Sequence, residues 1–419
     1  MKTLTCAFLV FEIIFIHSLE LNPDTISSMI ENSNYSIKSL EHKVSIMKNN
    51  IIMSGFDLMD TSFNYGVMDL QLKDNGIQSE MITHKINVMQ DIPISAKLYY
   101  KKQSALFDLA ISEEDISYQK LLIKQRILDL AVEYKKLSLI HRNTIESGVL
   151  LDRILEIANT KYSNGKLLLS DIIDIKIKKS ENSKMMYDID GMMEIVRLEI
   201  LDILDIEDVN TTITVPFLNT INETSLKDIT GIDTEKLFKK ALVFYPEYKM
   251  QTFIKEQSES NYKESINTII PDLGVGLGYA FNVNTPSRSS LSFDLSMKIP
   301  VFSLPSRISG IKMKEEMMKS QELLLKNYTL NLKISISKIV TQLTSTLNQI
   351  KTLDEGIIKN SEDSINSLFQ AYQVDRTEIS TLLNAIVMLF EERNRFYTLN
   401  SFFYSQLFRI ETVSGIKYY

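Results

Sequence analysis

The stretch YSNGKLLLSDIID at residues 162–174 decides the fold, because it returns in outline as YQVDRTEISTLLN at residues 372–384. The two stretches lie 210 residues apart (372 − 162 = 210), and each interrupts a long helical pattern. Two short segments with strand-like alternation precede each copy. The sequence therefore predicts a unit of two strands and a long helical hairpin that occurs twice.

Apolar side chains recur every seven residues on both sides of each stretch. This step keeps one seam of a helix against a neighbour and imposes left-handed supercoiling, and a short turn makes two such helices an antiparallel hairpin. A helix of about 65 residues would be ~100 Å long, although a plain coiled-coil rod would show the same ladder. We expect looser packing where the ladders weaken near the turns. The ladder positions are Leu109, Ile116, Ile123, Leu130, Leu137, Thr144, Leu151, Ala158, Ile175, Asn182, Ile189, Val196 and Ile203, and then Ile336, Leu343, Ile350, Ile357, Ser364, Ala371, Leu382, Leu389, Phe396, Phe403 and Ile410.

Residues 271–302 carry period-two alternation, which marks two strands with different faces. Each segment has the ~9–11 residues that a tilted membrane strand needs. The side chains on its second face are small or polar and could line water. Taken alone, such a pair is more often a soluble hairpin with one face on a core. The candidate lipid-facing residues are Leu273, Val275, Leu277, Tyr279, Phe281, Leu291, Phe293, Leu295, Met297 and Ile299.

A weaker version of this strand pair lies at about residues 56–92, with a turn predicted at residues 73–76. Four strands cannot close a barrel, and an open edge cannot sit in lipid because its backbone groups would have no hydrogen-bond partners. If these are membrane strands, the chain must therefore oligomerise. Two copies would supply eight strands and three copies twelve, and the latter number leaves room for a pore.

Composition and motifs narrow the class of protein. The net charge of −7 argues against a nucleic-acid partner. Residues 1–18 read as a secretory signal, and they contain Cys6, the single cysteine, so we expect no disulfide and no thiolate site. The scattered histidines give no metal-ligand spacing. With no phosphate-binding loop or nucleophile elbow, the sequence predicts no enzyme, catalytic residue, metal or cofactor.

Several short motifs, in this order, resemble the outer-membrane efflux factor family, the TolC-like exit ducts. The resemblance covers nearly all of the chain after residue 18, and the segment 90–93 is most similar to the metal- and drug-efflux branch. The motifs are Tyr162-x-x-Gly165, Tyr245-Pro246-Glu247, Pro271-Asp272-Leu273 with Gly278-Tyr279, Ile299-Pro300-Val301-Phe302, Tyr372-x-x-Asp375 and Gly415.

The resemblance implies a homotrimer in which twelve strands form one β-barrel in the outer membrane and twelve helices continue it as a periplasmic tunnel. Its partners would be outer-membrane lipid, a periplasmic adaptor (membrane fusion) protein and an inner-membrane transporter, and its cargo small molecules or metal ions. A type I protein-secretion duct would share this architecture. The alternative class is a secreted coiled-coil scaffold or adhesin without a pore.

The fold class is thus α+β with a two-fold internal repeat. We expect a first repeat at 19–209, with an N-terminal helix, strands at about 56–92 and a helical hairpin at about 94–209. A linker at 210–240, together with residues 22–50, would form an equatorial girdle. The second repeat, 241–419, would hold strands at about 271–302 and a hairpin at about 305–413, preceded by a helix at about 232–268.

The resemblance also implies a periplasmic aperture at the hairpin tips, whose turns are marked by Tyr162, Gly165 and Tyr372. Asp171 matches a family acidic position, whereas Thr381 and Asn384 stand where well-known members carry two aspartates. Carboxylate rings at such a mouth would favour cations, but the helix dipole explains Asp171 and Asp174 at helix starts equally well, and it is the better explanation for Glu378. The candidate aperture residues are Asp171, Asp174, Asp375, Arg376, Glu378, Thr381 and Asn384.

Overall fold

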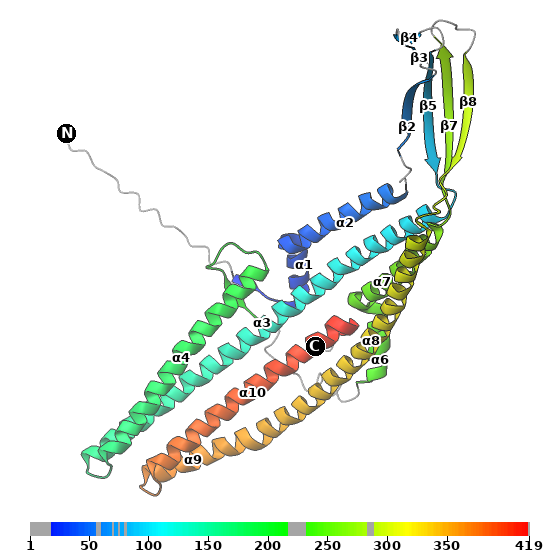
Figure 1. Cartoon of the computed structure of the whole chain (residues 1–419). Helices are drawn as coiled ribbons and strands as arrows, with labels where there is room; N and C mark the ends of the chain where they lie inside the picture. The colour runs from blue at the N-terminus through cyan, green and yellow to red at the C-terminus, as the bar shows by residue number, and fades with distance from the viewer. Residues whose placement is uncertain are drawn as a thin grey trace, which may run out of the picture. The chain divides into compact units, whose positions relative to one another are not determined.

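A computed structural model of the chain describes residues 18–55, 60–68, 71–73, 76–78, 82–216, 232–282 and 289–417 (Figure 1). These residues form two compact units, and each unit combines segments from both halves of the sequence. The first unit takes its described residues from 18–38, 118–245 and 332–417, and the second from 39–117 and 246–331. Of the predicted signal at residues 1–18, residues 1–17 lie outside the described residues, and Ser18 begins strand β1 (Ser18–Glu20).

Long helices dominate the first unit, and they form two helical hairpins. In the first hairpin α3 (Lys97–Ser163), which begins in the second unit, is followed by α4 (Leu169–Ile203). In the second, α8 (Leu304–Lys351) continues through the π-helical segment η4 (Thr352–Ile358) into α9 (Lys359–Gln373), and α10 (Ile379–Ser414) returns. These elements confirm the predicted pair of long antiparallel hairpins.

Short elements complete the first unit. The strands β1 (Ser18–Glu20) and β6 (Thr212–Thr214) pair in parallel, so the start of the described chain is tied to the segment after α4. The helices are α1 (Pro23–Ser33) and α6 (Thr234–Phe244). The predicted linker at 210–240 thus contains β6 and most of α6, and its residues 217–231 lie outside the described residues.

The second unit holds an antiparallel sheet of order β2-β5-β7-β8, in which β5 from the first half pairs directly with β7 from the second. Its strands are β2 (Ser62–Met68), β5 (Thr83–Ile92), β7 (Leu273–Asn282) and β8 (Ser290–Met297). A two-stranded hairpin, β3 (Gln71–Lys73) with β4 (Gly76–Gln78), stands between β2 and β5 in sequence. The unit also holds α2 (Tyr35–Gly55), of which all but residues 35–38 belong here, and α7 (Pro246–Asn267). The first parts of α3 (97–117) and α8 (304–331) belong to it as well.

The predicted strand pairs therefore exist, and they merge into one sheet. Residues 74–75 of the first predicted turn and 283–288 of the second lie outside the described residues. No helix among the described residues is both long enough and apolar enough to cross a membrane.

The π-helical segment corrects the predicted ladder of the second hairpin. Ile350 is buried as predicted, but beyond it Ser364 is exposed and Ala371 only half-buried. The buried positions are instead Ile365 and Tyr372, one residue further on. A π turn closes hydrogen bonds from residue i to i+5 and so accommodates one extra residue, which shifts the seam by one position. In the first hairpin the ladder continues through α3, where Thr144, Leu151 and Ala158 are all buried.

Candidate functional site at the hairpin tips

The first hairpin turns through a left-handed glycine. Gly165 has φ +71°, and its N–H donates to the Tyr162 carbonyl oxygen at 2.9 Å. The next N–H, that of Lys166, donates to the Lys161 carbonyl oxygen at 2.9 Å. This double closure satisfies carbonyl groups that the end of α3 would leave without partners. Glycine suits the turn because it adopts positive φ without a Cβ penalty.

The second hairpin repeats the motif with an aspartate in the left-handed position. Asp375 is equivalent to Gly165 (375 − 165 = 210) and has φ +58°. Its N–H donates to the Tyr372 carbonyl oxygen at 3.3 Å, and the Arg376 N–H donates to that of Ala371 at 2.9 Å. Aspartate is one of the few residues other than glycine that enter this conformation readily. The predicted equivalence of the two tips therefore extends to their backbone hydrogen bonds.

The side chain of Asp375 joins the two tips. Its Oδ1 lies 2.6 Å from Lys161 Nζ, and its Oδ2 lies 2.9 Å from Lys166 Nζ. Hydrogen bonds from Lys161 and then Lys166 lower the pKa of the Asp375 carboxyl. Lys161 also donates to the Tyr372 carbonyl oxygen and stands 4.1 Å from the centroid of its ring. Neither lysine was predicted as a site residue, and among the described residues Arg376 forms no ion pair.

Tyr372 and its counterpart Tyr162 have opposite surroundings. Tyr162 is 45% exposed, whereas Tyr372 is 2% exposed and its hydroxyl has no hydrogen-bond partner among the described residues. Burial, followed by the charges of Asp171 and Asp375, raises the pKa of the Tyr372 phenol. Tyr372 belongs to a core that joins α3, α4, α9 and α10: Leu151, Ile154, Ala158, Ile172, Ile175, Ile365, Tyr372, Ile379, Leu382, Leu383, Ile386 and Leu389.

A hollow of about 620 Å³ opens between the tips, and we call it the tip site. Its polar lining includes Lys161, Lys166, Asp171, Asp174, Asp375 and Glu378. Asp171 Oδ2 accepts the Leu168 N–H at 3.3 Å, so this carboxylate also caps the first turn of α4. Asp174 and Glu378 are exposed, and so are the remaining candidates Arg376, Thr381 and Asn384. The hollow brings together acids that the sequence predicted and lysines that it did not.

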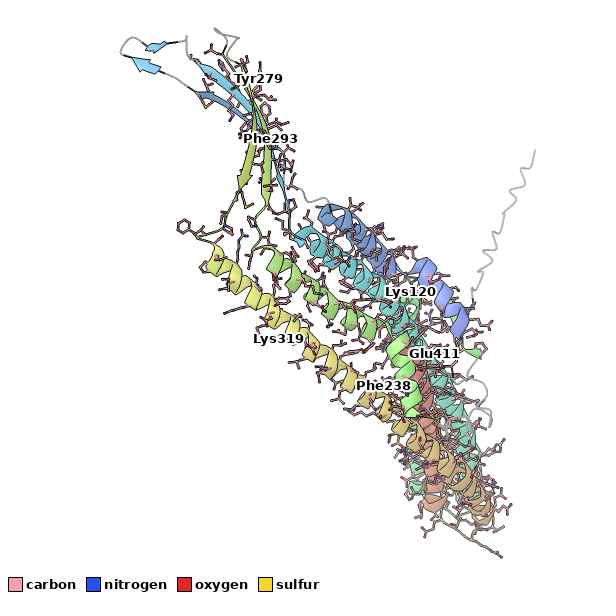
Figure 2. The ribbon with its side chains drawn as sticks, turned by 90° about the vertical axis from the view of Figure 1, so that its right-hand side faces the viewer. Lys120, Phe238, Tyr279, Phe293, Lys319 and Glu411 are labelled. Atoms are coloured by element: carbon pink, nitrogen blue, oxygen red, sulfur yellow. The ribbon has the colours of Figure 1, made fainter. Side chains whose placement is uncertain are left out.

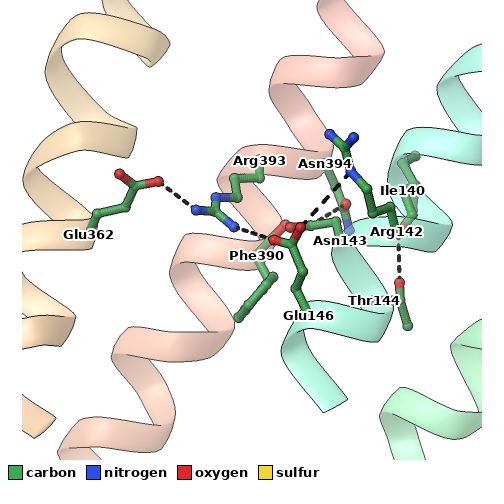
Figure 3. Close-up of polar contacts among 9 residues, drawn as sticks. All are labelled: Ile140, Arg142, Asn143, Thr144, Glu146, Glu362, Phe390, Arg393 and Asn394. Carbon is green, nitrogen blue, oxygen red and sulfur yellow. Dashed lines mark hydrogen bonds and ion pairs between the residues drawn. The ribbon is translucent and has the colours of Figure 1, made fainter. Parts of the chain in front are cut away.

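A second polar contact between the hairpins lies further along α10. Arg393 contacts Glu362 of α9 at 2.5 Å and Glu146 of α3 at 3.1 Å (Figure 3). Beside it, the buried Asn143 amide donates to Asn394 Oδ1 at 2.8 Å. Arg393 therefore ties three helices together, and its role was not predicted from the sequence.

The sheet of the second unit has one apolar and one polar face. Val88, Leu277 and Phe293 stand opposite one another across β5, β7 and β8, and Ile86, Tyr279 and Leu291 form the next row. Figure 2 labels Tyr279 and Phe293 on this sheet. Leu291 is 79% exposed, and Leu277, Phe293 and Leu295 are exposed as well. A contiguous row of exposed apolar side chains of this kind marks an interaction surface.

Charged side chains on the polar face meet across β7. Lys298 lies 2.7 Å from Asp91, and Lys85 lies 3.8 Å from Asp294, so side chains after and within β8 pair with β5. They cross β7 where it carries Gly274, Gly276 and Gly278. A Cβ on Gly276 would stand 3.4 Å from the Asp294 Cβ, so the glycines leave space for these neighbours. Asp294 and Lys298 therefore pair with β5, the strand on the far side of β7.

Within the described residues, no group of three or more His, Cys, Asp or Glu side chains is placed to hold a metal ion.

No known family profile matches the sequence, and neither does any curated protein. Solved structures do match over nearly the whole chain. VceC, an outer membrane protein of Vibrio cholerae, superposes with a TM-score of 0.78 at 12% identity, covering 95% of this chain and 97% of VceC.

Two further matches are outer membrane channels. CmeC of Campylobacter jejuni gives a TM-score of 0.72 at 11% identity, over 94% of this chain and 85% of CmeC. MtrE of Neisseria gonorrhoeae, in its open state, gives a TM-score of 0.68 at 10% identity, over 94% of this chain and 88% of MtrE. This chain has the fold of outer membrane channels. The fold class predicted from the repeated motifs, and the resemblance on which it rested, are thereby confirmed at the level of the fold.

Proposed function

We propose that this chain is the outer-membrane channel of a tripartite efflux system. Three copies would form a passive duct that receives small molecules or metal ions from an inner-membrane transporter through a periplasmic adaptor protein. The sheet would lie in the outer membrane and the helical hairpins in the periplasm. The fold shared with VceC, CmeC and MtrE supports this proposal.

The observation that carries the proposal is the sheet. Its order ends at β2 on one side and β8 on the other, and both end strands have a free edge within the described sheet. A membrane leaves no water to satisfy such edges, so they require strands from other copies. Joining β8 of one copy to β2 of the next would close a cylinder, with the apolar face toward lipid and the polar face toward the pore.

The test compares charges placed on the two faces of the sheet. Leu277→Asp and Phe293→Asp would put carboxylates on the proposed lipid face, at a cost for each copy below the ~2–4 kcal/mol of an Arg or Lys at the bilayer midplane. We expect both variants to lose the detergent-resistant oligomer and its conductance in planar bilayers. The matched control is Ser292→Asp, one residue from Phe293 on the polar face, which should still assemble and conduct. A wild-type protein that stays monomeric and conducts no current would refute the channel.

We further propose that the tip site is the periplasmic aperture. Asp171, Asp174, Asp375 and Glu378 line the tip site, at turns marked by Tyr162, Gly165 and Tyr372. The other candidates, Arg376, Thr381 and Asn384, lie outside its lining and would face the same mouth. Three copies would bring their exposed carboxylates to a narrow mouth, which would attract cations. Asp174→Ala, alone and with Asp171→Ala, should reduce the preference for cations in bilayer recordings. Unchanged reversal potentials in variants that assemble and conduct would show that the aperture is not at the tip site.

A further inference from the structure

Helix α6 carries a basic face that has no acidic partner within the part of the chain that the structure describes. Lys236, Lys239 and Lys240 are exposed, and none of them forms an ion pair among the described residues. The opposite face of α6 is buried through Leu237 and Ala241. The helix is thus held in place with its lysines directed outward.

The contact that fixes α6 to α8 uses other residues. Glu235 lies 2.9 Å from Lys333 Nζ, and the same ammonium stands 5.4 Å from the ring centroid of Phe238, which Figure 2 labels on α6. Both charges of this contact are therefore already satisfied. The three lysines of the basic face remain available for another partner.

A hollow of about 600 Å³ adjoins these lysines. Its apolar lining comes from Val243, which is 74% exposed, and Phe244. Phe244 itself packs against the end of α10, because a Cβ on Gly415 would come within 2.9 Å of its ring. The lining also contains Asp233, which caps the start of α6, and Glu235, which is paired with Lys333. The surface thus combines three lysines outside any ion pair with an uncovered apolar patch. Such a surface fits a short acidic segment that also carries an apolar side chain.

The chain itself contains such a segment, which begins in the last turn of α4 and continues just after it. Asp202, Asp205, Glu207 and Asp208 precede Val209, and among the described residues none of the four acids forms an ion pair. Glu207 and Asp208 are exposed, and Val209 is 58% exposed. We call residues 207–209 the acidic corner.

The acidic corner is held in one conformation by the helix that precedes it. The Arg197 guanidinium donates to the Val209 carbonyl oxygen at 2.6 Å and to that of Thr211 at 2.8 Å. Asp205 accepts the Tyr35 N–H at 2.8 Å, and Asp208 accepts the Asn210 N–H at 3.0 Å. Since the backbone is fixed before any partner arrives, docking would cost little conformational entropy.

The corner and the basic face stand at different edges of the first unit. Figure 1 shows α4 at one edge of the long helices and α6 beside α8 at the other. Complementary patches on two different edges make a heterologous contact, which generates a ring when the rotation between copies closes. Charge complementarity also fixes the orientation of such a contact.

We propose that the acidic corner of one copy docks on the α6 lysines of the neighbouring copy, with Val209 against Val243. This inference rests on the proposed homotrimer and adds to it a surface that sets which edges meet. The partner is a second copy of this chain, bound through carboxylate–ammonium pairs around an apolar contact.

Cross-linking tests the contact directly. Cys6 is the single cysteine, so a Cys6→Ser background is free of thiols. Asp208→Cys with Lys240→Cys, treated with a short bismaleimide, should give a covalent ladder of dimers and trimers. The matched control joins Asp208→Cys to Lys351→Cys, which lies about 27 Å along α8 from Lys333 (18 residues at ~1.5 Å) and should give no ladder. A product of monomer size, or no product in an assembled oligomer, would overturn the docking.

Charge reversal supplies a second test that does not depend on cross-linking chemistry. Lys239→Glu with Lys240→Glu should raise the concentration at which the oligomer dissociates by about tenfold, because like charges then face each other. Adding Glu207→Lys and Asp208→Lys to the same chain should restore the wild-type value. Failure of this rescue in a protein that assembles and conducts would overturn the docking and leave the channel standing. A wild-type protein that never assembles would instead count against the channel itself.

Discussion

Asp375 shows how one residue serves both backbone and charge. It holds the left-handed position that glycine holds at the first tip, and its carboxylate binds Lys161 and Lys166 of the other hairpin. Replacing it by asparagine or glycine separates the two roles, because both residues tolerate positive φ and neither can form the ion pairs.

We therefore expect Asp375→Asn and Asp375→Gly to fold with melting temperatures within about 2 °C of wild type while loosening the contact between the tips. Asp375→Val should be clearly less stable, because a β-branched side chain is strained at positive φ. Thermal unfolding would measure the change in stability, and bilayer conductance would report the loosened contact between the tips. A large loss of stability in Asp375→Asn would show that the ion pairs, and not the backbone, hold the tip.

The same carboxylate sets a pH dependence. Its pKa is lowered in the folded protein, so its ion pairs stabilise the tip above the ordinary aspartate pKa of about 3.9 and are lost as pH falls through the folded value. Conductance should therefore not change through Asp375 between about pH 5 and 8, and should rise under stronger acid. Asp375→Asn should remove the acid-induced rise in conductance. Bilayer recordings from pH 7 downward would measure it, and a rise that persists in Asp375→Asn would contradict this role of the carboxylate.

At the scale of elements, the π turn is the feature that regular counting misses. The ladder predicted Ile357, Ser364 and Ala371 at the seam, and the buried residues are Ile365 and Tyr372. Deleting Gly356 should convert Thr352–Ile358 to an ordinary helix and keep both parts of the seam in register.

We expect the Gly356 deletion to change the melting temperature by no more than a few degrees. Deleting Glu156 from the uninterrupted α3 should instead move every later seam residue away from its partner and prevent folding of the hairpin. Circular dichroism and thermal unfolding of the two deletions would compare them. Equal damage from both would mean that η4 does more than take up one residue.

Packing across elements also limited what the sequence could reveal about the site. The turn motifs marked Gly165 and Asp375, since tight turns depend on local residue types. Lys161, Lys166 and Arg393 could not be found this way. Lys161 and Lys166 pair with Asp375 more than 200 residues away, and only the docking of two hairpins brings them together. Local patterns carry no information about such contacts.

At the scale of the whole molecule, most of the fold followed from two periodicities. Alternation at Leu273 to Phe281 predicted a strand with two faces, and the seven-residue step predicted hairpins of the observed length. The pairing of β5 with β7 did not follow, because it joins the two halves of the chain. Nor did the β1–β6 pair, whose strands are too short to carry a pattern.

Assembly should show in the exchange of backbone hydrogens. β5 and β7 are paired on both sides within one chain, so their amides should exchange slowly in monomer and oligomer alike. Amides of β2 and β8 on the free edges should exchange fast in a Leu277→Asp monomer and slowly in the assembled wild type. Mass spectrometry of exchanged peptides would measure this, and edge strands left unprotected in the oligomer would contradict closure through β2 and β8.

The extra residue in η4 also bears on how the two repeats of this chain can diverge in sequence. One residue inserted into a supercoiled helical hairpin would normally rotate all later residues of that helix by about 100° about its axis. The apolar seam beyond the insertion would then no longer face its partner helix. Here a single wide turn absorbs the surplus within seven residues, so that Tyr372 still reaches the interior. The two repeats can therefore differ in length without losing the packing of their helices. Related chains could gain or lose one residue at this position in the same way.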